Sequence, residues 1–139
     1  MKLKRQLADE MLEALRESSG LWIRAGSEHR FIGIWHVVVK ERVFVRSWSV
    51  KEKGWYRAFL KEPNGAIQVG KQEIQIEAKR GRDKKLRDAI DQAYLEKYKT
   101  PGALKYAKDL GSAKSRATTM ELVVGVEKRR STKKEKSGR

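Results

Sequence analysis

The chain has 139 residues, a mass of 16.0 kDa and a formal charge of +15, a size that fits one compact domain. It contains no cysteine, which excludes disulfides, thiolate metal sites and thiol catalysis, and two histidines are too few for a histidine-rich metal site. No apolar run approaches the ~20 residues that span a bilayer, and no secretory signal is visible. We therefore expect a cytoplasmic protein with no metal site and no membrane contact.

Positive charge is concentrated at the C-terminus. Residues 127–139 carry seven basic and two acidic side chains and no large apolar residue. Such a segment cannot bury enough apolar surface to offset the entropy of ordering itself. We expect residues 1–126 to form one domain and residues 127–139 a disordered basic tail. The tail either keeps the chain soluble or contacts nucleic acid without regard to sequence.

The first half of the chain reads as one helix followed by strands. Leucines and Met11 recur at helical spacing and predict a helix over residues 4–17. Residues dense in β-branched and aromatic side chains follow, and three polar residues (40–42) suggest a hairpin connection. The predicted strands are 21–23, 31–39 and 43–50.

The second half alternates short strands with helices. Asp83 is a predicted N-cap for a helix whose apolar stripe runs from Leu86 to Tyr98, and Thr100-Pro101 opens a further short helix. The other predicted elements are a helix over 55–60, strands over 66–69 and around Ile74 and Ile76, and a final strand over 117–126. This order indicates an α+β fold with a small, mainly antiparallel barrel or strongly curled sheet.

The densest candidate binding site lies between residues 46 and 57. Cations and hydroxyl groups hold a phosphate, and aromatic faces hold a flat heterocycle. The alternative is that both tryptophans pack in the core while Arg46 and Arg57 pair with surface carboxylates. The candidate residues are Arg46, Ser47, Trp48, Lys53, Trp55 and Arg57.

No catalytic residue can be assigned, because the chain has neither a nucleophile motif nor a glycine-rich phosphate loop. His36 is expected to be half-buried and satisfied by hydrogen bonds, and Tyr94 and Tyr98 to anchor their helix. Asp88 and Asp91 are expected on different sides of that helix, which makes them a poor acid–base pair.

Six basic side chains fall within residues 79–87. Such a run is either a solvated loop or, together with Lys71 and Arg116, a surface that attracts anions. With the basic tail, it supports a second reading of the chain as a non-enzymatic nucleic-acid-binding module. A third reading is a cofactor-free dimeric scaffold.

Four segments together resemble the FMN-binding split-barrel proteins, the pyridoxamine-phosphate-oxidase-like fold that also includes deazaflavin-dependent nitroreductases. The resemblance covers most of residues 20–124 and is nearest to an uncharacterised bacterial branch. The segments are FIGIWHVVVKERVFVRSWS (31–49), GWYR (54–57), DAIDQAYLEKY (88–98) and ATTMELV (117–123).

The resemblance implies a split β-barrel with an N-terminal helix and a helix pair before the last strand. It also implies a homodimer that binds FMN or a deazaflavin at the subunit interface and supports a low-specificity oxidoreductase. Arg46 and Ser47 would bind the cofactor phosphate, with Lys53 and Arg57 as supporting cations and Trp48 or Trp55 as a wall. The GRKSG-like turn of the deazaflavin relatives is replaced by Arg24-Ala25-Gly26-Ser27-Glu28.

Overall fold

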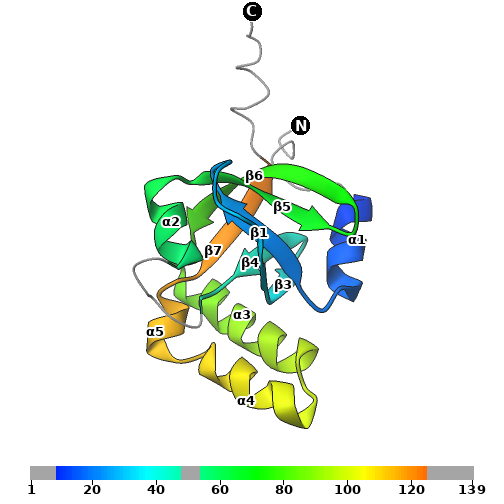
Figure 1. Ribbon diagram of the computed structural model, residues 1–139. Helices are drawn as coiled ribbons and strands as arrows, with labels where there is room; N and C mark the ends of the chain where they lie inside the picture. The colour runs from blue at the N-terminus through cyan, green and yellow to red at the C-terminus, as the bar shows by residue number, and fades with distance from the viewer. Residues whose placement is uncertain (1–8, 48–53, 125–139) are drawn as a thin grey trace, which may run out of the picture.

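The computed structural model describes residues 9–47 and 54–124 (Figure 1). Helix α1 (Asp9–Glu17) precedes a series of strands, and a group of helices precedes the last strand. The elements after α1 are β1 (Leu21–Ala25), β2 (Ile32–Ile34), β3 (His36–Val39), β4 (Arg42–Val45), α2 (Trp55–Lys61), β5 (Asn64–Val69), β6 (Gln72–Arg80), α3 (Lys84–Lys97), α4 (Pro101–Asp109), α5 (Ala113–Arg116) and β7 (Met120–Val124).

The strands form one antiparallel sheet of seven, in the order β2-β1-β5-β6-β7-β4-β3. The two edge strands, β2 and β3, are consecutive in the chain and are separated only by Trp35. The sheet therefore curls until its edges approach each other, which gives a nearly closed barrel. This architecture confirms the predicted α+β split barrel, with α1 at the N-terminus and α3 and α4 before β7.

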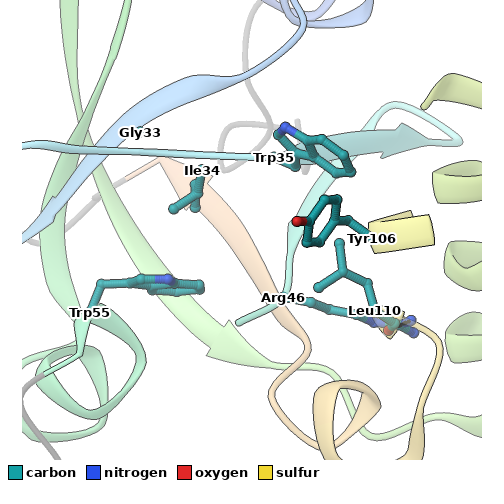
Figure 2. A pocket seen from close by; sticks show the side chains of 7 residues that line it. All are labelled: Gly33, Ile34, Trp35, Arg46, Trp55, Tyr106 and Leu110. Carbon is teal, nitrogen blue, oxygen red and sulfur yellow. Dashed lines mark hydrogen bonds between the residues drawn. The ribbon is translucent and has the colours of Figure 1, made fainter. Parts of the chain in front are cut away.

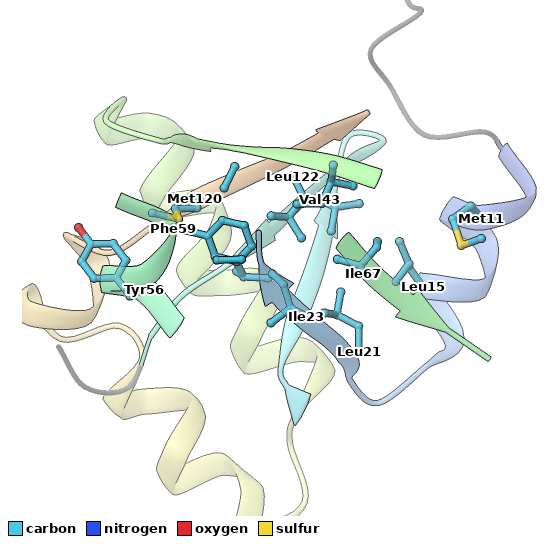
Figure 3. Packing of buried hydrophobic residues seen from close by; sticks show 14 of the residues in the cluster. Met11, Leu15, Leu21, Ile23, Val43, Tyr56, Phe59, Ile67, Met120 and Leu122 are labelled. Atoms are coloured by element: carbon cyan, nitrogen blue, oxygen red, sulfur yellow. The ribbon is translucent and has the colours of Figure 1, made fainter. Parts of the chain in front are cut away.

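The interior of the barrel is the first hydrophobic core. In β1 the residues Leu21, Ile23 and Ala25 are buried and the two between them are more exposed, as expected when one strand face points inward. Side chains from β1, β4, β5 and β7 converge there (Figure 3). Tyr56 from α2 and Met11 from α1 lie at opposite ends of the cluster in this view.

A second core lies between the outer side of the barrel and the helix pair. Phe44 of β4 points away from the barrel interior, opposite to Val43 and Val45, and packs in a cluster with Ile90 and Tyr94 of α3. Helix α3 lies against this part of the sheet, and α4 lies beside α3 on the side away from the strands (Figure 1). The second core fixes the helix pair relative to the strands.

The predicted capping residues begin their helices. The Asp83 carboxylate accepts a hydrogen bond from the Leu86 backbone N–H at 2.8 Å, and the Thr100 hydroxyl accepts one from Ala103 at 3.4 Å. These contacts explain why α3 and α4 begin where the sequence predicts. Helix α5 was not predicted, because its four residues carry no apolar stripe.

The predicted strand boundaries need correction at several places. The predicted strand 31–39 is divided at Trp35, because the chain leaves one sheet edge there and enters the other. The hairpin connection is a turn at Lys40 and Glu41, both at positive φ, and not three residues, since Arg42 pairs with Val39.

Pairing extends or shortens three other predicted segments. Strand β5 begins at Asn64 because it pairs with Glu77, and β6 continues through Arg80 because it pairs with Met120. The first two residues of the basic run therefore lie in a strand and not in a loop. The last strand begins at Met120 and not at residue 117.

Some predictions lie outside the described residues. They are the helix end at 4–8, the strand end at 48–50, the end of the last strand at 125–126, and the tail 127–139. None of the described helices is long and apolar enough to cross a bilayer.

His36 is fully buried, and the prediction of a half-buried histidine was wrong. Its Nε2 donates a hydrogen bond to the Leu15 carbonyl at 2.6 Å, and Lys97 Nζ donates to the same carbonyl at 3.0 Å. Its Nδ1 is buried with no hydrogen-bond partner among the described residues. Burial, and then the neighbouring Lys97 charge, lower the pKa of His36 to about 4. This cluster joins α1, β3 and α3 through an uncharged imidazole.

We predict that acid destabilises the fold through His36. Its pKa rises from about 4 in the folded chain to its ordinary 6.5 on unfolding, so the unfolded chain binds more protons between these values. The free energy of unfolding should therefore fall by about 3 kcal/mol between pH 7 and pH 4 through this group. Urea unfolding across this pH range measures it.

His36→Gln is the matched variant, because its amide can still donate to the Leu15 carbonyl and does not titrate. It should lose less stability than the wild type over the same pH range. Equal slopes for His36→Gln and the wild type would contradict the prediction.

Candidate functional site

A cleft of about 320 Å³ opens where the barrel edges approach each other. It lies between the β2–β3 junction, α2 and the end of α4 (Figure 2). Three of its walls are aromatic and one lining residue is charged. The described residues that line it are Gly33, Ile34, Trp35, Arg46, Trp55, Tyr106 and Leu110.

Two of the three aromatic side chains that line the cleft, Trp35 and Trp55, are held in place by contacts with other rings. Trp35 stacks on Tyr98 with ring centroids 4.1 Å apart and an angle of 1° between the planes. Trp55 meets Phe59 edge-to-face with centroids 6.2 Å apart. Tyr106 is 48% exposed and forms the outer part of the cleft. Rings that are fixed before a ligand arrives can stack on a flat molecule at little entropic cost.

Tyr94 and Tyr98 anchor α3 behind this wall. The Tyr94 hydroxyl donates to the Trp35 carbonyl at 3.1 Å, and the Tyr98 hydroxyl donates to the His36 carbonyl at 2.7 Å. Burial raises the pKa of both phenols, that of Tyr98 to about 12. Both tyrosines therefore keep their hydrogens, which confirms the predicted anchoring role.

Arg46 is buried at the base of the cleft, and its side chain is 0% exposed. Its Nε donates to the Thr119 hydroxyl at 2.8 Å. One Nη donates to the Asp91 carboxylate and, at 2.9 Å, to the Leu110 carbonyl, while the other donates to the Arg87 carbonyl at 3.0 Å. Four of the five guanidinium hydrogens are thus bound by the chain itself.

The Arg46 charge belongs to a network that continues along α3. Arg116 of α5 donates to Asp91 at 2.5 Å and to Asp88 at 2.9 Å. Asp88 and Asp91 therefore share one partner, and the prediction that they face different sides of α3 was wrong; residues three apart on a helix are neighbours. The hydrogen bond from Arg116 lowers the pKa of Asp88, and burial lowers the pKa of Arg46, against the effect of Asp91.

The predicted site residues are only partly brought together. Arg46 and Trp55 both line the cleft. Ser47 is buried beside Arg46, where its backbone N–H donates to the Thr118 hydroxyl at 2.8 Å. Arg57 is exposed on α2 and is not among the described lining residues. Trp48 and Lys53 lie outside the described residues.

The sequence reasoning did not find Trp35, Tyr106 or Leu110 as cleft residues. Trp35 falls inside the predicted continuous strand 31–39, and Tyr106 inside the short helix that Thr100-Pro101 opens. No local pattern marks Leu110, which reaches the cleft only because α4 ends beside it.

The basic run surrounds the start of α3. Lys79, Arg80, Arg82 and Lys85 are exposed, and Lys84 pairs with Asp88 at 3.2 Å. Arg116, expected to join this surface, is instead bound to Asp88 and Asp91. Nucleic-acid binding through this run stays a prediction. Within residues 9–47 and 54–124, no group of three histidine or carboxylate side chains could hold a metal ion.

The chain matches one family of known sequences. A family model described as "Uncharacterized protein conserved in bacteria (DUF2255)" matches residues 16–122. No curated protein matches the chain.

Solved structures share the fold. The conserved hypothetical protein Rv2991 of Mycobacterium tuberculosis is 11% identical, with a TM-score of 0.55 over 87% of this chain and 81% of that chain. A Listeria innocua protein, named provisionally as a pyridoxamine 5′-phosphate oxidase, is 10% identical, with a TM-score of 0.53 over 84% of this chain and 90% of that chain. Identities this low show a common fold alone.

We predict that Arg46→Met destabilises the chain by about 3 kcal/mol, because it removes one member of a buried charged pair and leaves its acceptors without donors. Arg57→Met is the matched control, since Arg57 is exposed and its loss should change stability by no more than about 0.5 kcal/mol. Urea unfolding of both variants measures the difference. Equal stabilities would show that the Arg46 network does not hold the helices in place.

Proposed function

We propose that the chain, which belongs to this family of uncharacterized bacterial proteins, binds a flavin or a deazaflavin through its ring system in the aromatic cleft. The observation that carries the proposal is the set of three aromatic side chains, Trp35, Trp55 and Tyr106, around one cleft at the barrel split. Pockets with mostly apolar and aromatic walls and few polar groups are typical of cofactor sites. The shared fold with the Listeria innocua protein supports it.

The residues of the site take different roles in this proposal. Trp55 and Tyr106 form walls for the ring. Arg46 and Ser47 position the strand end beneath it through their contacts with Thr119 and Thr118. Lys53 and Arg57 are the cations proposed for a phosphate, where the ligand carries one.

A bound flavin supplies hydride chemistry, so the chain would act as a low-specificity reductase without a protein acid or base. The residues around the cleft would bind and orient the ring and exclude water from its apolar face. Tyr94 and Tyr98 take no part in proton transfer, because both hydroxyls donate to backbone carbonyls and their pKa values are raised.

We also propose a homodimer, as the family resemblance implies. Exposed aromatic side chains support this proposal: Trp22 is 53% exposed on β1 and Tyr106 48% on α4. Large aromatic residues left in water are common at subunit interfaces. Sedimentation equilibrium distinguishes a dimer from the 16.0 kDa single chain.

We predict that FMN binds the full-length chain at one site and that its fluorescence is quenched by the cleft aromatics. Binding should persist at about 300 mM salt, where a nonspecific attraction between a polycation and a phosphate is screened. Trp55→Ala should weaken binding by about tenfold or more, because one stacking wall is lost. A fluorescence titration measures the dissociation constant.

Leu60→Ala is the matched control, since it removes an exposed apolar side chain of the same helix, α2, that is not among the described lining residues of the cleft. It should bind FMN as the wild type does. Quenching that disappears with salt for FMN, and a deazaflavin that also fails to bind, would exclude the proposed function and leave the basic surface as the next candidate.

A further inference from the structure

The charge distribution of the cleft determines which part of a ligand it can recognise. A buried phosphate needs several free hydrogen-bond donors, usually on cations. Among the seven described residues that line the cleft, Arg46 is the only charged one. Whether the cleft binds an anion therefore depends on what Arg46 can offer.

Arg46 offers little to an incoming anion. Its side chain is 0% exposed, and four of its five hydrogens are donated to Thr119, Asp91, Leu110 and Arg87. Its guanidinium lies next to Leu110 (Figure 2). A phosphate could bind it only by displacing hydrogen bonds that would otherwise stay unpaired in a buried place.

The Arg46 charge is also compensated locally. Its guanidinium pairs with the Asp91 carboxylate, and the neighbouring Arg116 pairs with both Asp91 and Asp88. Lys84 contacts Asp88 at 3.2 Å on the exposed surface of α3. A cation whose charge is offset by an adjacent carboxylate creates only a weak field in the space beside it. Among its described lining residues, the cleft therefore offers an anion no uncompensated cation.

The volume of the cleft also favours a ring system over a whole nucleotide. Ligand sites commonly measure about 300–1,000 Å³. At about 320 Å³, the cleft is at the small end of that range. It suits a planar ring system between Trp55 and Tyr106 better than a complete nucleotide.

We propose that the cleft recognises an uncharged, planar, fused-ring heteroaromatic group, and that a phosphate on the ligand contributes little to affinity. This inference rests on the proposed function and narrows it from a phosphate-anchored cofactor to a ring-anchored one. The phosphate of FMN, when present, stays outside the cleft. Its contribution to affinity is that of a solvent-exposed ion pair, about fivefold or less.

The experiment compares three ligands with the same ring system on the full-length chain at about 300 mM salt. FMN carries the ribityl phosphate, riboflavin lacks the phosphate, and lumiflavin carries a methyl group in place of the whole ribityl chain. Fluorescence titration gives a dissociation constant for each. We expect riboflavin to bind within about fivefold of FMN, and lumiflavin to bind at the same site in competition with riboflavin.

Tyr106→Ala tests whether the ring system binds in the cleft. Tyr106 is 48% exposed, so its truncation should not disturb the fold, which circular dichroism checks. It should weaken FMN and riboflavin by the same factor, about tenfold, because it acts on the ring that both share. Leu60→Ala serves again as the control that leaves both affinities unchanged.

The outcomes separate the two proposals. Comparable affinities for FMN and riboflavin, lowered together by Tyr106→Ala, support ring recognition. A preference for FMN greater than about fivefold at about 300 mM salt overturns this inference and leaves the proposed function standing. Failure of all three ligands, together with a deazaflavin, overturns both.

Discussion

The positive charge of Arg46 is buried between the barrel and the helices, where its side chain has no contact with solvent. A buried charge is tolerated only when hydrogen bonds and an opposite charge replace its hydration. Its four acceptor residues come from three separate segments: Arg87 and Asp91 on α3, Leu110 after α4, and Thr119 before β7. None of these segments can shift without leaving a buried donor or acceptor unpaired. The wall of the cleft is therefore rigid at Leu110, because this residue belongs both to the hydrogen-bond network and to the cleft.

The elements that the sequence predicts well are those determined by neighbouring residues. Alternating burial in β1 follows from the two-residue period of a strand, and Asp83 starts α3 through a contact three residues away. The break at Trp35 has a different origin. Residues 31–39 satisfy strand preferences throughout, so nothing local interrupts them. The chain divides there because a curled sheet must place consecutive residues on its two opposite edges, a requirement of the whole barrel.

The same distinction explains what could be predicted of the site. The cluster 46–57 correctly draws attention to Arg46 and Trp55, which line one cleft. The sequence could not show that the donors of Arg46 are engaged, because Asp91 is 45 positions away and Thr119 is 73. An arginine followed by a hydroxyl residue and a tryptophan gives the same local sequence pattern in two cases: when its side chain contacts a ligand, and when its side chain connects two helices. Only the fold distinguishes a binding cation from a structural one.

Trp35 joins the two edge strands and also lines the cleft, so the opening of the barrel is physically connected with ligand binding in the cleft. Edge strands are paired on one side only, and they open more readily than the strands between them. A molecule bound against Trp35 requires both edges to be in place, so it stabilises the closed barrel by an amount that rises with the logarithm of its concentration above the dissociation constant. The backbone amides of β2 and β3 would then exchange their hydrogens with solvent more slowly. Ligand binding in the cleft would thus be measurable as slower amide hydrogen exchange in the two strands that close the barrel.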